Sequence, residues 1–553
     1  MRSIPGFRNI RRGEKKGLEK EEKGYICLSI LLLVWMAVFA FVNGSCQSFW
    51  ADELSSIGYI RSGINLGEMF QAYLHVDTNL PLYSLILYSI YRIVPYGEKF
   101  LLIPSILFCV LGIAALAYAV KKVKGSNAGF LAVCIGTASS TLLWQGAWEI
   151  RCYAMVFCLS SFTLLAYVNK SLNNIKKNVI LYGVALFLLL WSHWFALLLT
   201  ASYGLTDMFF ILRKKLSWKN IFPYLVAGGS LCPWFVIVYL NQQHNIADYW
   251  TVAPTWKNTV WTVLFLLSGR RALWYVCLLS CATLIAYPAY KLLIRNVKPL
   301  QRLILASKKR TWDITKKEIL CVQCVLSLVW VIGITFLYSY FINPQGSMYV
   351  ERYFMVIMPH VFFVTVCGIC RIIEIGRYII KKLVKQDSFS SRILRGGFTA
   401  IIAVWMVIEL VLCYRDSYIS IRKPMEDYRG AAEFLIKDKG IWKKNSLFIG
   451  NNRYCVFDGF VDYYFTKRGL DEPYHAVDGM VNLPEENRFY PNYKNRGKKW
   501  ILQHDKIYSL KIHMDMGNEL KQFIKKYYTL DRSKEKNGIE IWKRKKEINN
   551  GLR

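Results

Sequence analysis

The sequence predicts an all-α polytopic membrane protein with about 11–13 transmembrane helices, followed by a small soluble α/β domain. Hydrophobic residues make up 54% of the 553 residues, and many fall in runs that approach the roughly 20 residues needed to cross a bilayer. Lys and Arg gather between these runs, as in the loops of membrane proteins. The last part of the chain, residues 415–553, is charged and contains no further run of this kind.

The apolar runs define a membrane region at residues 25–414. The first run, 25–42, is longer than the apolar part of a usual signal peptide and no clear small-residue cleavage site follows it. We therefore expect a retained signal anchor. The other clear runs are 130–144, 155–168, 179–190, 195–212, 222–240, 273–294, 319–342, 354–373 and 398–413.

The formal net charge of +34 comes from 71 Lys and Arg against 37 Asp and Glu. In a soluble protein this balance would suggest a nucleic-acid partner. Here the cations lie between apolar runs, so the positive-inside rule explains them and we expect no nucleic acid. A basic tail, residues 1–24, is then cytoplasmic. The other clusters lie within 121–124, 170–177, 213–219, 295–317 and 371–395.

Residues 80–120 allow two topologies. They hold two apolar stretches, separated by a polar break at residues 95–99. Two crossings would place the later basic loops outside the cell, whereas one crossing plus an interfacial segment would keep them cytoplasmic. An odd total number of crossings would place the C-terminal domain outside, on the same side as the loop 43–79.

The cysteines show no disulfide framework. Most of the 15 lie in apolar runs, including two CxxC pairs, Cys321/Cys324 and Cys367/Cys370. Such pairs can hold zinc, but within a membrane helix an i,i+3 spacing merely places two small apolar side chains on one face. In the C-terminal domain we expect a helix at 428–437 and strands at 446–449 and 539–542.

The loop 43–79, directly after the first apolar run, carries the pair Asp52-Glu53. Acidic side chains this close to a membrane are costly, and they usually have a function. We therefore expect this pair to form the chemical centre of the protein. Farther along the loop, Asp77 and Asn79 precede Pro81, which suits the first turn of a helix. Asp77 is then either a ligand-binding residue or a helix cap.

Three more polar motifs interrupt the apolar pattern. They are Glu149-Ile150-Arg151-Cys152-Tyr153, then His193 between Ser192 and Trp194, and Glu351-Arg352-Tyr353. Glu149 and Arg151 can form a surface ion pair, which would add little to stability, or Arg151 can bind phosphate oxygens. If the basic loops are cytoplasmic, all these motifs face the opposite side. A carboxylate base beside cations that hold phosphate is then the expected chemistry.

Taken together, these motifs resemble those of GT-C glycosyltransferases, in the bacterial branch related to protein O-mannosyltransferases and aminoarabinose transferases. The first matches are Asp52-Glu53 and the stretch Asp77-Thr78-Asn79-Leu80-Pro81-Leu82-Tyr83, which is similar to a D-x-H-P-P-L-Y motif. An E-x-R-x-Y-like motif at Glu149 to Tyr153, His193 and Arg352-Tyr353 follow in the same order. The chain departs from the pattern at Asn79, Leu80 and Leu102, where His or Lys, Pro and Arg are frequent.

The resemblance implies an enzyme of the plasma membrane with its C-terminal domain outside the cytoplasm. It would move a sugar from a polyprenyl phosphate donor to an extracytoplasmic glycan, lipid or protein, with inversion. Asp52 would be the base or would orient the acceptor, with help from Glu53. Arg151, Arg352 and His193 would hold the phosphate. The other expected substrate-binding residues are Asp77, Asn79, Tyr83, Glu149, Tyr153 and Tyr353.

Neither a cofactor nor a metal has a clear sequence signature. The chain lacks P-loop, GxGxxG and HExxH motifs, and a divalent metal is left open. A transporter or flippase for a lipid-linked or anionic substrate would also explain charges between apolar runs. It would not explain the large first loop or the terminal domain. A polysaccharide polymerase or ligase is a further alternative. Such proteins usually carry their long catalytic loop later in the chain, so the early position of Asp52-Glu53 argues against it.

Overall fold

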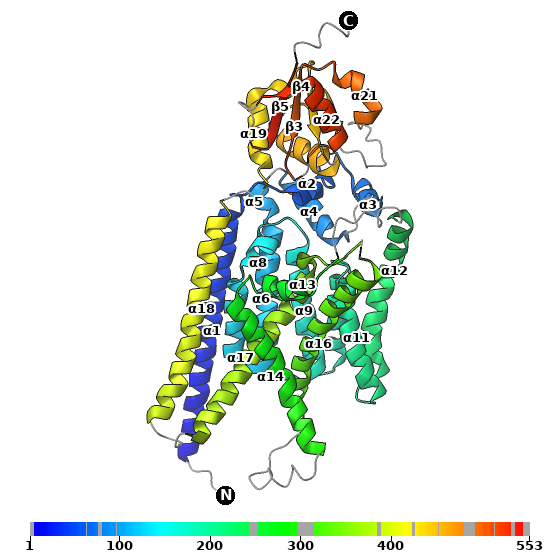
Figure 1. The fold of residues 1–553 in the computed structure, drawn as a ribbon. Coiled ribbons are helices and arrows are strands. Elements are labelled where there is room, and N and C mark those ends of the chain that lie inside the picture. The colour runs from blue at the N-terminus through cyan, green and yellow to red at the C-terminus, as the bar shows by residue number, and fades with distance from the viewer. Residues whose placement is uncertain are drawn as a thin grey trace.

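A computed structural model describes most of the chain, and helices dominate it (Figure 1). The described residues are 5–61, 63–75, 80–95, 97–242, 253–296, 314–344, 346–383, 389–422, 426–451, 453–479, 493–513, 515–531 and 537–545.

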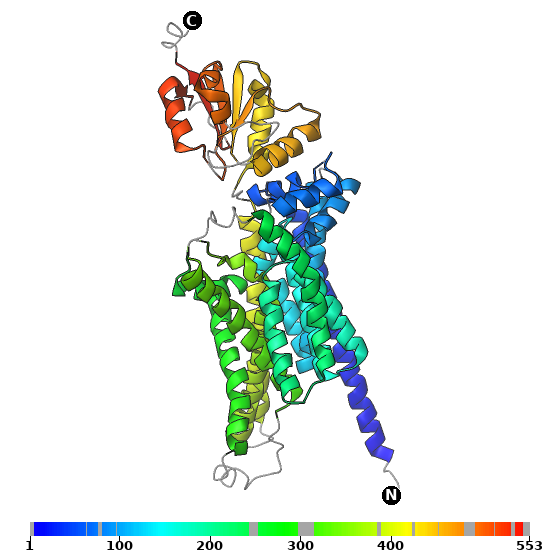
Figure 2. The same cartoon turned by 90° about the vertical axis from the view of Figure 1, so that its right-hand side faces the viewer.

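Long apolar helices run side by side and form the membrane bundle (Figures 1 and 2). Seven segments in the described residues are long and apolar enough to span a membrane, or up to eight if a pair of helices bent by 60° is one span. The seven are Glu21–Gly44, Glu98–Lys124, Tyr153–Leu172, Trp218–Asn241, Arg271–Leu293, Lys316–Ile342 and Glu351–Arg377. The bent pair is Ser126–Thr137 and Ser140–Ala147. The chain is therefore a multi-pass membrane protein.

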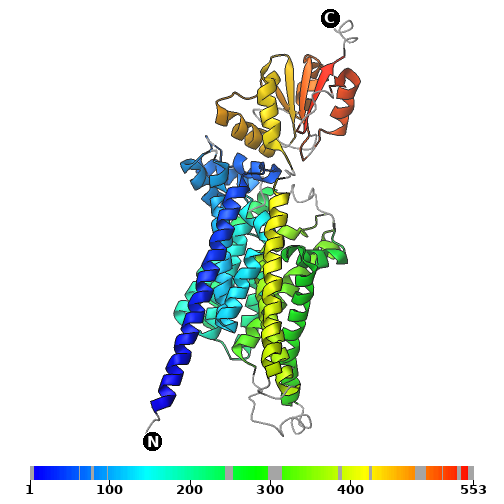
Figure 3. The ribbon, with the colours of Figure 1, turned by 90° about the vertical axis from the view of Figure 1, so that its left-hand side faces the viewer.

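The helices of the bundle have these bounds: α1 Pro5–Gly44, α6 Ile103–Lys124, α7 Ser126–Thr137, α8 Ser140–Leu142, η1 Leu143–Ala147, α9 Tyr153–Leu172, α10 Lys176–Leu190, α11 Ala196–Leu212, η2 Trp218–Ile221, α12 Phe222–Gln242, α13 Trp256–Leu266, α14 Arg271–Asn296, α16 Lys316–Leu337, η4 Tyr338–Ile342, η5 Glu351–Ile357, α17 Met358–Leu383 and α18 Phe389–Ser420. Helices α1 and α18 lie at one side of the bundle (Figure 3), where Tyr414 packs edge-on against Phe39.

Among the described residues, seven or eight segments have the length and composition of a full span, whereas 11–13 crossings are expected from sequence. Two further predicted runs form the shorter helices α10, with 15 residues, and α11, with 17. Helix α4, Leu82–Ile93, has only 12 residues and lies at the end of the bundle next to the C-terminal domain (Figure 1). Residues 80–120 thus contain one full-length span, which agrees with the alternative of one crossing plus an interfacial segment.

Short helices cover the end of the bundle that faces the C-terminal domain (Figures 1 and 2). They are α2 Ala51–Gly58, α3 Leu66–His75, α4 and α5 Glu98–Leu101. The N-terminal end of α1 lies at the opposite end of the bundle (Figure 1).

The C-terminal domain is built on a five-stranded sheet of order β2-β1-β3-β5-β4. Strand β1 pairs in parallel with β2 and β3, and β5 pairs antiparallel with β3 and β4. The expected helix and both expected strands are present, as α19, β1 and β5. The bounds are α19 Tyr428–Asp438, η6 Gly440–Trp442, β1 Ser446–Gly450, η7 Arg453–Val461, α20 Asp462–Tyr464, η8 Thr466–Arg468, β2 Ala476–Asp478, α21 Tyr493–Ile501, β3 Lys506–Leu510, α22 Asn518–Tyr527, β4 Tyr528–Leu530 and β5 Ile539–Arg544.

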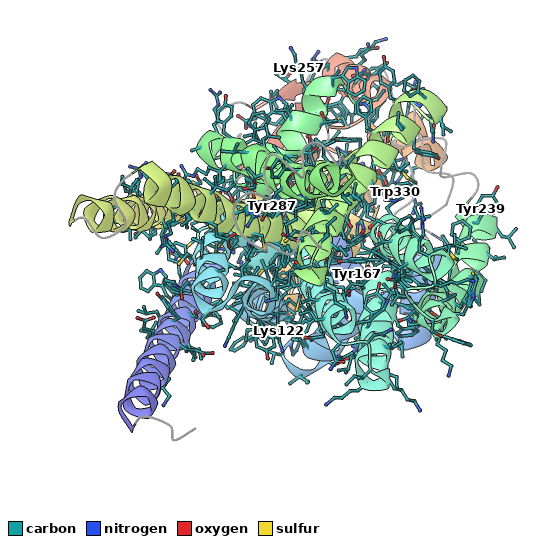
Figure 4. The ribbon with its side chains drawn as sticks, turned by 90° about the horizontal axis from the view of Figure 1, so that it is seen from below. Lys122, Tyr167, Tyr239, Lys257, Tyr287 and Trp330 are labelled. Carbon is teal, nitrogen blue, oxygen red and sulfur yellow. The ribbon has the colours of Figure 1, made fainter. Side chains whose placement is uncertain are left out.

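A buried ion pair joins α9 to α11 far from the C-terminal domain. Lys170 and Asp207 are almost fully buried and contact each other, and Tyr167 and Tyr224 donate hydrogen bonds to the Asp207 carboxylate at 3.2 and 2.7 Å. The Lys170 ammonium also lies 4.5 Å from the centre of the Tyr182 ring. Viewed from below, Tyr167 lies among the helices, whereas Tyr239 lies at the rim (Figure 4). This network fixes how α9, α10, α11 and α12 pack.

Removing one member of this pair should destabilise the bundle strongly. Lys170→Met leaves a buried carboxylate without its cation, which should cost about 3–5 kcal/mol of unfolding free energy. Unfolding of the detergent-solubilised protein would measure the loss. The double variant Lys170→Met/Asp207→Leu should recover part of it, and equal stability of the single variant and the wild type would contradict a role for the pair.

Candidate functional site

Asp52 and Glu53 occupy the first turn of α2, beneath the C-terminal domain. Trp50 precedes this helix in an extended conformation, and its backbone N–H donates to Oε2 of Glu53 at 3.1 Å. This contact is half of a capping box, and two acidic residues in the first turn also suit the helix dipole. The local sequence therefore favours a helix that begins at Ala51, which places Asp52 in its first turn.

Glu53 is buried, with 3% of its surface exposed. Its Oε1 accepts a hydrogen bond from the backbone N–H of Ile150 at 2.9 Å, so the carboxylate ties α2 to the segment after η1. Burial raises the pKa of Glu53 well above its ordinary value, and the neighbouring Glu149 raises it further. These contacts make Glu53 a residue that holds the site together.

Asp52 is more accessible than Glu53 and lies between two arginines. Its Oδ2 is 3.0 Å from Nη2 of Arg352 and 3.7 Å from Nη2 of Arg151, and its side chain is 28% exposed. Arg151 also donates from Nη1 to the Asp52 carbonyl at 3.2 Å and to Ser56 Oγ at 3.0 Å. The carboxylate and two cations thus share one small space, as expected from the sequence.

Aromatic rings flank Arg352 and His193. The Arg352 guanidinium lies 5.1 Å from the Trp50 ring centre and 5.9 Å from that of Tyr153. The His193 ring lies 6.2 Å from Tyr153 and 5.2 Å from Tyr353. The Trp50 and Tyr153 rings shield the Arg352 guanidinium from water, which strengthens its attraction for an anion.

His193 is a neutral side chain in this setting. Burial and the positive charges of Arg151 and Arg352 lower the pKa of His193 to about 3. Its Nδ1 accepts a hydrogen bond from the backbone N–H of Phe195 at 3.2 Å, which leaves Nε2 to carry the proton. His193 can therefore offer an N–H donor to a phosphate oxygen, but it adds no charge.

Glu149 is a second buried carboxyl group. Its Oε2 has no hydrogen-bond partner among the described residues, and burial raises the pKa of Glu149 to about 8. Its carbonyl accepts a hydrogen bond from Ser105 Oγ at 2.7 Å, and Ser105 is 2.8 Å from the Tyr83 hydroxyl. Tyr83 thus supports the site through Ser105.

The raised pKa of Glu149 predicts that stability falls as pH rises. The folded state keeps the proton up to about pH 8, whereas the unfolded chain releases it near 4.5. The contribution is therefore fully present below pH 4.5 and is lost as pH rises to 8. Thermal unfolding of Glu149→Gln at pH 5 and 8 should show a weaker pH dependence than the wild type, and an unchanged slope would refute this assignment.

Two cavities meet at Arg352. One, of about 180 Å³, is lined by Glu53, Glu149 and Glu426 together with Trp144 and other residues. A larger and more open one, of about 590 Å³, is mostly apolar, with linings from Trp261, Leu264, Phe265 and Val350. Arg352 and Gln145 line both cavities. The charged site therefore borders an apolar cavity at the end of the bundle.

The C-terminal domain contacts the loop that carries Asp52 at several points, which sequence reasoning missed. Arg429 donates to the Ser45 and Gln47 carbonyls at 3.0 and 2.6 Å. Arg429 also forms an ion pair with Glu98. No sequence motif marks this contact, because it joins segments more than 300 residues apart.

Two further contacts bring η7 against α2 and against Arg61, which follows that helix. Arg61 pairs with Asp458 at 2.5 Å. The backbone at Gly459 approaches so closely that an added Cβ would lie 2.2 Å from the Leu54 carbonyl oxygen, so only glycine fits there without a shift.

Most of the residues expected from sequence come together here. Asp52, Glu53, Glu149, Arg151, Tyr153, His193, Arg352 and Tyr353 form the site, with Tyr83 behind it. Asp77 and Asn79 lie outside the described residues. Within the described ranges, no three His, Cys, Asp or Glu side chains converge as they would around a metal ion.

The bundle, the charged loop at its end and the α/β domain above that loop define a membrane protein with the GT-C type of fold. The solved structures that it resembles are those of ArnT from Cupriavidus metallidurans. It matches the structure bound to undecaprenyl phosphate with a TM-score of 0.53 and 10% identity, and the apo structure with 0.54 and 11%. Each match covers 94% of this chain and 98% of the other.

These matches confirm the predicted fold, and the mannosyltransferase-like branch stays a prediction. No protein-family model matches the chain. No curated protein matches its sequence either.

Proposed function

We propose that this protein is an integral membrane glycosyltransferase that moves a sugar from a polyprenyl phosphate donor to an acceptor on the side of the C-terminal domain. The observation that carries the proposal is the Asp52 carboxylate, held beside Arg352 and Arg151 where a cavity lined partly by glutamates meets a more open apolar cavity. A base and two cations at such a boundary suit a lipid substrate with an acidic leaving group.

The apolar cavity would hold the lipid part of the donor. A polyprenyl chain would lie against Trp261, Leu264 and Phe265, and its phosphate would reach Arg352 at the inner end. Arginine suits this task because its planar guanidinium binds phosphate oxygens in pairs. The likeness to ArnT, one structure of which is bound to undecaprenyl phosphate, supports a polyprenyl phosphate as the carrier of the donor sugar.

In the reaction, the acceptor oxygen attacks the anomeric carbon while the bond from that carbon to the phosphate oxygen breaks. The donor phosphate replaces Asp52 at Arg352, and the freed carboxylate takes the acceptor proton, or orients the acceptor, on one face of the sugar. Arg352, Arg151 and the Nε2–H of His193 stabilise the phosphate that leaves from the other face. Opposite faces for attack and departure give inversion at the anomeric carbon.

A donor panel tests this function. Membranes that contain the protein would be incubated with polyprenyl phosphates carrying different hexoses and pentoses, and release of the lipid phosphate would be followed. We expect release for at least one donor, dependent on added acceptor. Movement of the intact donor across the membrane without release would instead favour a flippase.

The proposed topology has the N-terminal tail in the cytoplasm and the C-terminal domain outside. Glu472 lies on the exposed surface of the C-terminal domain, and Lys177 is exposed at the start of α10. In a background without the exposed Cys27, Cys46 and Cys232, the variant Glu472→Cys should react with an impermeant thiol reagent added to intact cells. Lys177→Cys should react only after the cells are opened, and the reverse pattern would overturn the topology.

A further inference from the structure

His513 adopts a strained backbone conformation at the edge of the site. It follows β3 in a loop of the C-terminal domain and has a φ of +63°. This left-handed region is uncommon for residues other than glycine, and at functional sites such strain often fixes the direction of a side chain. The imidazole has a specific target here, because its Nδ1 lies 2.7 Å from Oε1 of Glu426.

Glu426 carries this contact onward to the first residue of α2. Its Oε2 accepts a hydrogen bond from the backbone N–H of Ala51 at 2.9 Å, directly before Asp52. The first N–H groups of a helix have no partner within the helix, and a carboxylate there is stabilised by the helix dipole. Glu426 also lines the small cavity together with Arg352.

Asp52 is therefore anchored through both of its neighbours in sequence. On one side Glu426 holds the Ala51 N–H, and on the other Glu53 holds the N–H of Ile150. From these contacts we infer that His513 and Glu426 are positioning residues of the C-terminal domain, which fix the start of α2 so that Asp52 faces Arg352. The inference rests on the proposed function, in which Asp52 serves the sugar transfer.

Protonation of His513 strengthens this anchor. The groups that act on its ring are Glu426, Asp52 and Arg352, and the Tyr428 hydroxyl donates to the neighbouring carbonyl of Ile512 at 3.5 Å. The hydrogen bond to Glu426 raises the pKa of His513, and burial of the ring and, to a smaller extent, Arg352 oppose this effect. The ion pair is complete below this raised pKa and weakens to a neutral hydrogen bond as pH rises through it.

The test compares His513→Gln, Glu426→Gln and the double variant with His475→Gln as a matched control. His475 belongs to the same domain, where it contacts His504 at 2.8 Å away from the cavity. Each site variant should lower kcat on the order of 10- to 100-fold with little change in the donor KM, since a displaced catalytic group slows the chemical step. The double variant should be no slower than the worse single variant, because both residues act through one contact.

The pH profile separates positioning from a structural role. Wild-type kcat should fall as pH rises through the raised pKa of His513, His513→Gln should lose this limb, and His475→Gln should keep it. A His513→Gln enzyme with wild-type kcat and pH profile would overturn the inference.

Hydrogen exchange of the backbone amides in residues 51–58 gives an answer that needs no enzyme activity. Exchange should be faster in both site variants than in the wild type and in His475→Gln. Unchanged exchange would overturn the inference, whereas faster exchange in a protein that transfers no sugar would refute the proposed function alone.

Discussion

Replacing Asp52 with Asn is expected to lower kcat for sugar transfer by about 10²- to 10⁴-fold, the range typical of a lost general base. The amide keeps the size of the side chain but cannot take a proton from the acceptor. It also removes the charge that pairs with Arg352 at 3.0 Å. Initial rates of lipid phosphate release, measured with saturating donor and acceptor, would give the change in kcat.

Glu68→Gln is the matched control for this experiment. Glu68 belongs to the same loop, is exposed, and caps α3 by accepting from the Asn65 N–H at 2.8 Å, which an amide oxygen also does. It should transfer sugar at the wild-type rate. Transfer by Asp52→Asn at a rate within a few-fold of wild type would remove Asp52 from the mechanism.

Replacing Arg352 with Gln should produce the second large effect. The guanidinium lies beside Asp52, is enclosed by Trp50 and Tyr153, and borders both cavities. Its loss removes a cation from the leaving phosphate, so kcat/KM for the donor should fall by about 10²- to 10³-fold. Arg352→Lys should recover only part, because an ammonium lacks the planar fork.

Arg377→Gln provides the control for Arg352. It changes an exposed arginine at the other end of the same apolar segment, and it should leave donor kinetics unchanged. If Arg352→Gln had the donor KM and the kcat of the wild type, the proposal that Arg352 binds the donor phosphate would be wrong.

The parts of the fold that depend on hydropathy were predictable from the sequence. The long apolar runs and the charged C-terminal region gave the bundle and the α/β domain correctly. The number of crossings stays a prediction, because α10 and α11 match the predicted runs but, with 15 and 17 residues, are shorter than the seven full-length segments of the described residues. Strands β2 and β4, with three residues each, are too short for a clear pattern of alternation.

The convergence of the candidate residues was predictable where a charged residue interrupts an apolar run, and their roles stay predictions. Asp52, Arg151 and Arg352 stand out because charged residues interrupt an apolar pattern. Glu426 and His513 are ordinary polar residues in a polar domain, and only the docking of that domain onto α2 brings them to the site. Sequence patterns of this kind cannot reveal a contact that depends on tertiary packing.

The central claim is that a lipid-linked sugar phosphate reacts beside Asp52. A structure of the protein in a lipid nanodisc, bound to a non-hydrolysable phosphonate analogue of a donor identified by the panel, tests it most directly. The account predicts phosphonate oxygens at about 3 Å from the Arg352 guanidinium, with the anomeric carbon toward Asp52 and the lipid along Trp261. A phosphonate bound elsewhere, with the Asp52–Arg352 pair undisturbed, would contradict it.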